Sequence, residues 1–328
     1  KRREVQLAIT NGTKARTLYD IDFLLGVYDE TRMGAFRFKL DPTGDFLDNN
    51  SEKSTPPWSN VRELQQAVVQ YENDAESKAI NNWLKLLIAP GSSLGGARPK
   101  ANILDDENQL WIAKFPSKND SIDKAAWEFL TYKLAINAGV DMADCRLQKV
   151  SGRFHTFFTR RFDRIGTDRI HFSSAMTMTG NNEDTIKDQP ASYLDIVEFI
   201  QDHGCNIDEN LAQLWRRIVF NIAVSNTDDH LRNHGFVLNA QGWELSPAYD
   251  INPSIDKDGL ALNIDMTNND LDFELAKNVG EYFRLDNFKM NRIIREVVDS
   301  VKHWEEFAKE IGIPRTEQKL MGAAFKTD

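Results

Sequence analysis

Residues 226–236, NTDDHLRNHGF, place acidic, amide and basic side chains between a helical apolar pattern and a strand-like one. Asn233 follows Asp228 by five positions, and Asp250 comes directly after a segment that predicts a tight hairpin. Such a set could position a hydroxyl group, accept its proton and hold Mg²⁺ on nucleotide phosphates. Mg²⁺ prefers hard oxygen ligands, which a carboxylate and an amide carbonyl provide. The spacing therefore predicts a phosphotransfer site, with an ordinary polar loop between a helix and a strand as the alternative.

The other polar residues of this segment indicate less specific roles. We expect Asp229 either to be solvated or to help hold the loop, and Arg232 to cover the surface. We expect His230 to orient Asp228 or the transferring phosphate, and a structural hydrogen bond within the loop is the equal alternative.

A glycine-rich segment, GSSLGGARPK, occupies residues 91–100. It matches neither the phosphate-binding pattern that ends in Gly, Lys and Ser or Thr nor Gly-x-Gly-x-x-Gly. A glycine-rich bend nevertheless exposes backbone N–H groups without side-chain obstruction, which suits phosphate oxygens. Arg98 and Lys100 add positive charge. The segment predicts a phosphate-binding loop, and a surface turn is the alternative.

Lys114 ends an apolar strand pattern, and Glu128 follows fourteen positions later in a helical pattern. A strand lysine that contacts phosphates and is steadied by a helix glutamate recurs in kinases. Alternatively, Lys114 is a charge on an edge strand that discourages aggregation, and Glu128 faces solvent. The order of the parts favours the kinase interpretation: glycine-rich loop, lysine, glutamate, Asp-x₄-Asn, hairpin and second Asp.

The elements that must position these residues follow from the apolar periodicity. Helices are predicted over 61–87 in two pieces, and over 123–139, 208–226 and 286–311. Strands are predicted over 34–40, 101–104, 110–115, 146–150, 153–162, 235–239 and 243–246. The sequence therefore predicts an α+β protein with a strand-rich N-terminal lobe, a mostly helical C-terminal lobe and a cleft between them.

The composition limits the class of protein. The chain has 328 residues, of which 41% are hydrophobic and 27% charged, as in a globular protein large enough for two cores. No apolar run approaches the ~20 residues of a membrane-spanning helix. The N-terminus, KRREVQLAIT, has no signal-peptide core, so we expect a cytoplasmic protein without membrane contact. Because there is no initiator Met, we expect residues to be missing upstream.

Charge and cysteine content exclude two further classes. A net charge of −10 disfavours a globally basic nucleic-acid binder, which needs clustered Lys and Arg to neutralise phosphates. Cys145 and Cys205 are too few for a disulfide framework or a zinc site, and we expect them to be small buried residues.

Four blocks of the sequence, in their order along the chain, resemble the signature segments of the HipA family, the serine/threonine kinases of HipA–HipB toxin–antitoxin modules. The blocks are GSSLGGARPKA, FFTRRFDR, NTDDHLRNHGF and LSPAYDINP. LLGVYDETRMGAFRF also resembles the N-terminal region of the family, so the likeness covers roughly residues 20–255. It implies a bilobal protein-kinase-like fold similar to that of HipA and the phosphoinositide kinases. Residues 1–78 would be a partial N-terminal subdomain, 79–160 the kinase N-lobe and 161–328 the helical C-lobe.

The resemblance implies ATP-dependent phosphorylation of a protein Ser or Thr, with ATP and Mg²⁺ as cofactors. Asp228 would be the catalytic base with His230 beside it, and Asn233 and Asp250 would bind Mg²⁺. Glu128 would support the site. ATP would be contacted by Gly95, Gly96, Ala97, Arg98, Pro99, Lys100, Lys114 and Tyr249, and by the backbone of an adenine-binding hinge at Arg160, Arg161 and Phe162.

Two positions have particular implications. Arg160 stands where the family often has an acid, so the resemblance assigns no role to its side chain. Ser93 lies where HipA-type kinases carry a self-phosphorylated serine. A phosphate there adds negative charge that opposes ATP, so we expect autophosphorylation to eject the loop. A serine that merely satisfies a turn is the alternative.

The resemblance also implies partners. These are a small helix-turn-helix antitoxin of HipB type, operator DNA contacted mainly through it, and a protein substrate; some family members modify an aminoacyl-tRNA synthetase.

Two other functions stay open. A phosphotransferase acting on a lipid or small-molecule hydroxyl is one, because Asp-x-His-x-x-Asn loops also resemble phosphoinositide kinases. An inactive kinase-like co-repressor is the other, although the presence of Lys114, Asp228, Asn233 and Asp250 disfavours it.

Overall fold

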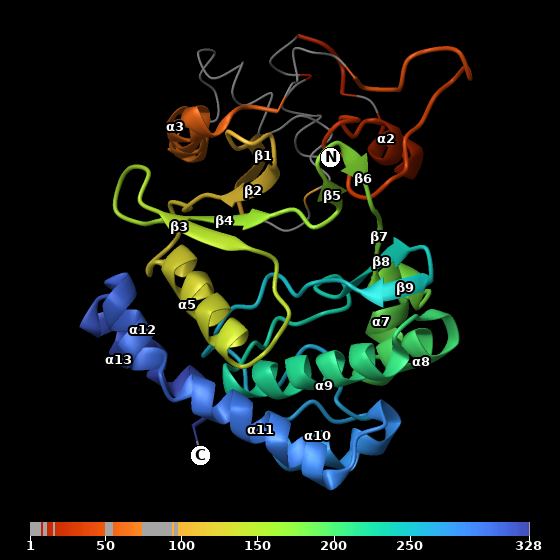
Figure 1. Ribbon diagram of the computed structural model, residues 1–328. Coiled ribbons are helices and arrows are strands. Elements are labelled where there is room, and N and C mark those ends of the chain that lie inside the picture. Colours follow the sequence, from red (N-terminus) through yellow and green to blue (C-terminus); the bar gives the residue numbers. More distant parts are fainter. Residues whose placement is uncertain are drawn as a thin grey trace. The chain divides into compact units, whose positions relative to one another are not determined.

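The structure is a computed structural model that describes Ala8, Leu94 and residues 12–15, 17–49, 55–73 and 98–327. The chain folds as two compact units, whose elements are labelled in Figure 1. Unit 1 comprises Lys1–Ser121 and Leu147–Arg169, and unit 2 comprises Ile122–Arg146 and Ile170–Asp328. The division of the sequence at residues 78 and 160 stays a prediction.

Unit 1 is built on a four-stranded sheet in which the strands follow the order β1-β2-β4-β3. β1 and β2 form the predicted hairpin, and β2 pairs antiparallel with β4 on its other side. In the hairpin turn, the Asp105 carboxylate accepts hydrogen bonds from the backbone N–H groups of Glu107 and Gln109. The strands are β1 Lys100–Leu104, β2 Leu110–Lys114, β3 Cys145–Gln148 and β4 Thr156–Arg160, which confirms the predicted strands of this region.

One apolar cluster joins this sheet to α3 (Val61–Asn73). Leu64, at a helical spacing from the other apolar residues of α3, is buried in the cluster with Ile103 and Phe158. Trp58, in the 3₁₀ helix η2 (Trp58–Asn60), stacks on Phe158 with ring centroids 4.4 Å apart. The first of the two helices predicted over 61–87 is therefore confirmed, and the second lies outside the described residues.

The N-terminal part of unit 1 has little regular structure. It contains α2 (Asp20–Leu25), and the strand predicted over residues 34–40 is wrong, because this segment runs as loop and bends. The Gly34 N–H donates to Asp163, and the Gly34 carbonyl accepts from Arg164, so side chains take the place of a strand partner. Two short strands that the sequence did not predict, β5 Arg164–Ile165 and β6 Asp168–Arg169, pair with each other.

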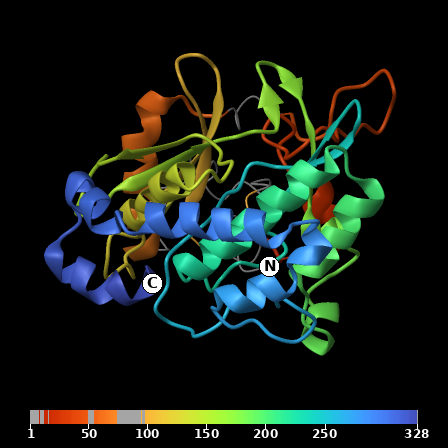
Figure 2. The same cartoon turned by 60° about the horizontal axis from the view of Figure 1, so that its bottom comes forward.

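Unit 2 is organised around α9 (Ile207–Ala223), which confirms the helix predicted there. α9 packs beside α11 (Asn287–Val301), as Figure 2 shows, and also contacts α8 (Tyr193–His203) and α10 (Phe273–Asn278). The predicted helix over 123–139 is α5 (Lys124–Asn137). The Asp123 carboxylate caps its start by accepting from the Ala126 N–H, and Gly139 follows its end with a φ of 73° that favours glycine.

The long helix predicted over 286–311 is wrong, because it is divided into α11 and α12 (Trp304–Ile311). The His303 N–H bonds the Ser300 carbonyl in a turn between them. This break lets Trp304 stack on Phe325, with ring centroids 4.7 Å apart. Apolar stacking thus overrides the local helical pattern.

A three-stranded sheet in the order β7-β8-β9 completes unit 2. β8 (Gly235–Asn239) and β9 (Gly242–Leu245) form the predicted hairpin, and β7 (His171–Ser174) was not predicted. A Cβ atom on Gly235 would lie 2.3 Å from the Phe172 ring, so only glycine lets β7 and β8 approach this closely. The remaining short helices are α6 Ala175–Met178, α7 Thr185–Asp188, η4 Gly280–Phe283, α13 Arg315–Met321 and η5 Gly322–Ala324.

Candidate active site

The loop of residues 226–234, here called the Asp228 loop, begins where α9 ends. Ser225 has a φ of 50°, a left-handed conformation that stops the helix. The Asn226 N–H then returns to the Asn221 carbonyl at 2.8 Å, and the Asn233 N–H donates to the His230 carbonyl at 2.7 Å. Two tight turns therefore fix the path of the chain between α9 and β8.

The two adjacent carboxylates of this loop have opposite environments. Asp228 is exposed, whereas Asp229 is only 2% exposed. The Asp229 Oδ2 accepts from the Tyr193 hydroxyl at 2.5 Å and from Asn221 Nδ2 at 2.8 Å, and it lies 2.7 Å from His234 Nε2. Asp229 therefore holds the loop, as one of its two predicted roles required, and the solvated alternative is wrong.

The sequence did not reveal the partners of Asp229. Burial, followed by the charge of Asp229, raises the pKa of the Tyr193 hydroxyl, so this group stays a hydrogen-bond donor. Asn221 is a polar residue among the buried apolar residues of α9, and that exception to the pattern was the available signal. Nothing in the sequence marked His234 as a partner of Asp229, because it stands four positions after His230 in a segment that is polar throughout.

Asn233 is oriented by Asp228. Its Nδ2 donates to the Asp228 carbonyl at 3.2 Å. Because the amide nitrogen is used in this way, the amide oxygen is the atom that remains for a cation. This orientation suits the Mg²⁺ ligand that the sequence predicts at Asn233.

Asp250 lies half-buried beyond the β8–β9 hairpin. Its φ of 60° is unusual for a residue with a side chain, and such strain is concentrated at functional sites. Its Oδ1 accepts from Asn252 Nδ2 at 3.2 Å. The conformation and this bond orient the carboxylate that we expected to bind Mg²⁺.

Tyr249 and His230 have more limited options. The Tyr249 hydroxyl donates to the Arg232 carbonyl at 2.8 Å, so in a contact with ATP it could only accept a hydrogen bond, and its ring could pack. Burial, followed by the charge of Asp250, raises the pKa of this hydroxyl. The His230 Nδ1 is buried and has no hydrogen-bond partner among the residues that the structure describes. The predicted roles of both residues stay predictions.

Lys114 lies at the end of β2, between β1 and β4, so the edge-strand alternative is wrong. Its side chain is buried, and its Nζ lies 5.5 Å from the centroid of the Phe157 ring on β4. This distance permits a cation–π interaction. Glu128 is buried on α5 in unit 2, which makes the solvent-facing alternative wrong for it as well.

Only part of the glycine-rich loop can be described. Arg98 donates from Nε to the Phe115 carbonyl at 3.0 Å and pairs with Asp120 at 2.9 Å. The Phe115 N–H donates to the Pro99 carbonyl, and Lys100 begins β1. The predicted positions Ser93, Gly95, Gly96 and Ala97 lie outside the described residues.

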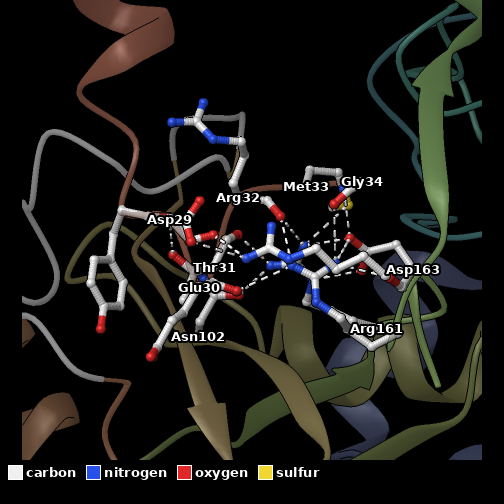
Figure 3. Close-up of polar contacts among 12 residues, drawn as sticks. Asp29, Glu30, Thr31, Arg32, Met33, Gly34, Asn102, Arg161 and Asp163 are labelled. Carbon is white, nitrogen blue, oxygen red and sulfur yellow. Dashed lines mark hydrogen bonds and ion pairs between the residues drawn. The ribbon is translucent and has the colours of Figure 1, made fainter. Parts of the chain in front are cut away.

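The predicted hinge contains a buried arginine, shown in Figure 3. Arg160 is exposed, but Arg161 is buried and its guanidinium donates to the Thr31 carbonyl at 2.7 Å and to Asn102 Oδ1 at 3.0 Å. The Arg161 N–H donates to the Leu110 carbonyl at 2.9 Å. That N–H and the side chain are therefore used within unit 1, and any hinge contact would come from the neighbouring backbone groups of residues 160–162.

Asp163 is the anionic partner of this arginine. Its carboxylate pairs with Arg161 and Arg164, each at 2.6 Å, and accepts from the Gly34 N–H at 2.7 Å. Burial by itself would raise the pKa of Asp163, but the hydrogen bonds and charges of the two arginines outweigh it and hold that pKa below its ordinary value. The sequence did not predict this network, although Arg161, Asp163 and Arg164 all stand in the block FFTRRFDR.

The side chains of unit 2 fit Mg²⁺ that arrives with a nucleotide. Among the described residues, no group of three or more His, Cys, Asp and Glu could hold a metal. Asn233 and Asp250 offer an amide oxygen and a carboxylate, and Mg²⁺ commonly takes one or two such protein ligands with water and phosphate oxygens. The set of donors therefore suits a phosphate-bound ion.

Comparisons with known proteins show which family the chain resembles. Over residues 92–305 the sequence matches the family of the HipA-like C-terminal domain. It is 27% identical over 179 residues to a Haemophilus influenzae protein named "Putative kinase", covering 49% of this chain and 52% of that protein. It is 23% identical over 226 residues to "Putative kinase Y4mE" of Sinorhizobium fredii, covering 66% and 47%. The chain thus spans about half the length of the curated relatives it matches.

The fold is similar to that of a chain in the solved Shewanella oneidensis complex of the toxin–antitoxin system HipA, HipB and its operator DNA. The TM-score is 0.65 at 18% identity, and the likeness covers 97% of this chain and 79% of that chain. It confirms the predicted protein-kinase-like α+β fold.

Within the part of the chain that the structure describes, no helix could span a membrane. Since the family match covers more than half of its residues, the chain belongs to the HipA-like C-terminal domain family.

Proposed function

We propose that this chain is a HipA-type protein kinase that uses ATP and Mg²⁺ to phosphorylate a Ser or Thr hydroxyl. The observation that carries the proposal is the contrast within the Asp228 loop. Asp228 is exposed, while the residue beside it is buried and held by three hydrogen-bonding partners. A free carboxylate on a fixed backbone suits a group that must meet an incoming hydroxyl. Family membership and the names of the two relatives support the coarser part of the proposal, a HipA-type kinase.

In the proposed reaction, the oxygen of the acceptor hydroxyl bonds to the γ-phosphorus of ATP. Asp228 accepts the proton that this hydroxyl loses. The bond between that phosphorus and the β,γ-bridging oxygen breaks, and ADP leaves. Asn233 Oδ1 and the Asp250 carboxylate would hold Mg²⁺, which would neutralise charge on the phosphates. Lys114 and Lys100 would add positive charge for the phosphates, while Arg98 is paired with Asp120, and the remaining backbone groups of residues 160–162 would receive adenine.

The proposal is tested by incubating the chain with γ-labelled ATP and either lysate proteins or lipid vesicles, with and without Mg²⁺. We expect label on protein Ser or Thr with Mg²⁺, and none with Asp228→Gln. Label on lipid alone would instead support the lipid-hydroxyl alternative. A folded wild-type chain that labels neither acceptor, nor any small molecule of the lysate, would support the inactive co-repressor.

We also propose a toxin role, with a small helix-turn-helix antitoxin of HipB type that carries most of the contact with operator DNA. The similar solved structure is a complex of a HipA with HipB and operator DNA, which supports such partners. A net charge of −10 fits a chain that contacts DNA mainly through a partner. In a mobility-shift assay, we expect the chain to retard operator DNA only with the antitoxin, and equal retardation without it would contradict this role.

We further propose that Ser93 is autophosphorylated and that its phosphate blocks ATP. We expect Ser93→Asp to weaken ATP binding, because negative charge opposes the incoming phosphates, whereas Ser93→Ala should bind ATP as wild type does. Calorimetric titration with ATP and Mg²⁺ measures both variants. Normal binding by Ser93→Asp would contradict the switch.

A further inference from the structure

Three asparagines, here called the asparagine relay (Asn221, Asn226 and Asn252), join the Asp228 loop to the loop of Asp250. Asn226 Nδ2 donates to Asn221 Oδ1 at 3.1 Å, and the Asn252 N–H donates to Asn226 Oδ1 at 3.3 Å. Asn252 Nδ2 in turn donates to Asp250 Oδ1. At the other end, Asn221 Nδ2 donates to Asp229, next to the proposed base. One line of hydrogen bonds therefore runs from the base loop to a proposed Mg²⁺ ligand.

The relay begins on a helix, and its first two side chains are buried. Asn221 lies in the last turn of α9, and Asn221 and Asn226 are each 1% exposed. A buried amide that donates and accepts at once cannot be replaced by an apolar residue without leaving a partner unsatisfied. The relay is therefore a specific set of bonds between the two loops.

The relay connects two strained backbones. Ser225, before Asn226, has a φ of 50°, and Asp250 has a φ of 60°. The Ser254 N–H also donates to the Ser225 carbonyl at 3.1 Å. Left-handed conformations at residues with side chains persist only where neighbouring contacts impose them. The hydrogen bonds between the loops supply such contacts at both positions.

We propose that Asn226 and Asn252 are positioning residues that set where the Asp250 carboxylate stands relative to Asp228 and Asn233. They act through Asp250 and do not touch the substrate. This role rests on the proposed kinase function, because it gives the relay the task of aligning a Mg²⁺ ligand with the base. It predicts that removing a hydrogen bond of the relay changes the Mg²⁺ concentration for half-maximal transfer more than it changes the rate at saturating Mg²⁺.

Asn226→Ala removes the side-chain hydrogen bonds of the relay at Asn226, and the matched control is Asn210→Ala. Asn210 is also a buried asparagine with two hydrogen bonds, from Nδ2 to the Cys205 carbonyl and from the Leu245 N–H to Oδ1. It lies on α9 and bonds neither of the two loops. We expect the Mg²⁺ concentration for half-maximal transfer to rise about three- to tenfold in Asn226→Ala, the factor for one ordinary hydrogen bond. In Asn210→Ala we expect it to stay within about twofold of wild type.

Hydrogen exchange without nucleotide or Mg²⁺ gives a second readout that does not require activity. We expect the amides of Ile251, Asn252 and Ser254 to exchange about tenfold faster in Asn226→Ala and at the wild-type rate in Asn210→Ala. Asn252→Ala keeps its backbone N–H, so it should raise the Mg²⁺ requirement while leaving exchange unchanged. It also replaces Asn226→Ala if that variant does not fold.

The outcomes separate the two proposals. Wild-type exchange in Asn226→Ala, or the same effects in Asn210→Ala, would overturn the positioning role even in an active enzyme. If Asn226→Ala does not fold, a wild-type Mg²⁺ requirement in Asn252→Ala overturns it. If the wild-type chain transfers no phosphoryl group, the kinase function fails, and the positioning role fails with it whatever the exchange shows.

Discussion

Residues 160–164 in unit 1 and the Asp228 loop in unit 2 each contain two adjacent like charges, one exposed and one buried. Arg160 is exposed and Arg161 is buried, just as Asp228 is exposed and Asp229 is buried. The buried members are held by different means. Arg161 is held by the charge of Asp163 and by main-chain carbonyls, whereas Asp229 is held by a tyrosine, an asparagine and a histidine.

This difference matches two tasks. The ion network in unit 1 joins residues more than a hundred positions apart, because Arg161 and Arg164 bond the carbonyls of residues 30, 31, 32 and 34. A buried ion pair is expensive to break, since the remaining charge stays desolvated. The donors around Asp229 are directional and carry fewer charges, which suits a loop whose neighbouring carboxylate must be free for chemistry. We infer that the first network secures the fold and the second orients a reactive group.

The largest expected effect is that of Asp163→Ala. It leaves the buried Arg161 and the half-buried Arg164 without their anion, so the free energy of unfolding should fall by about 3–5 kcal/mol. Urea denaturation followed by tryptophan fluorescence measures it. Asp168→Ala, which removes an exposed carboxylate nearby, is the control and should change stability by less than about 0.5 kcal/mol. Equal effects of the two variants would contradict the role given to the network.

Asp229→Asn should have the next largest effect. The change keeps the shape but removes the charge that accepts three hydrogen bonds, so we expect a loss of about 2 kcal/mol in stability. The same substitution at Asp228 is the matched control, because that side chain is exposed and should cost less than about 0.5 kcal/mol. A greater loss of stability in Asp228→Asn than in Asp229→Asn would reverse the comparison.

Acid should affect unit 1 through Asp163. Its pKa is held below the ordinary value, so its contribution to stability is complete above the unfolded pKa of about 3.9 and is lost as pH falls through the lower folded pKa. We therefore expect wild type to lose stability as pH falls below about 4, and Asp163→Asn to lose less over the same range. Denaturation at pH 5 and pH 3 tests this, and equal acid slopes would contradict it.

The smallest effect is expected for Arg160→Ala. Its side chain is exposed, and the proposed hinge uses the backbone, so stability should change by less than about 0.5 kcal/mol and ATP affinity by less than about twofold. Calorimetric titration with ATP and Mg²⁺ measures the affinity. A tenfold loss would instead give the Arg160 side chain a direct role in binding the nucleotide.

The sequence predicted the elements that local patterns define. The β1–β2 and β8–β9 hairpins, α5 and α9 have complete periodic patterns with turn or cap residues at their ends. β7 was missed because four residues without a strong pattern pair only with the distant β8. In the strand expected over 34–40, Asp163 and Arg164, far along the chain, instead bond the backbone of Gly34, and the Phe38 carbonyl accepts from the Leu47 N–H.

The candidate site shows the same limit. The types and spacing of Asp228, Asn233 and Asp250 predict the chemistry that we propose for the Asp228 loop, and this chemistry stays a prediction. Tyr193 and Asn221 determine which of the two adjacent acids is buried. The tertiary fold, not the local sequence, brings these two residues next to the loop. Burial of a charged side chain is decided by distant partners, so a local pattern does not reveal it.

The most direct test of the proposed chemistry is the single-turnover rate of phosphoryl transfer by Asp228→Asn at saturating ATP and Mg²⁺, with nucleotide affinity measured on the same preparation. Loss of the general base should lower the rate about 10²- to 10⁴-fold and leave the affinity within about twofold of wild type. A rate equal to that of wild type, in a variant that binds nucleotide normally, would contradict the assignment of Asp228.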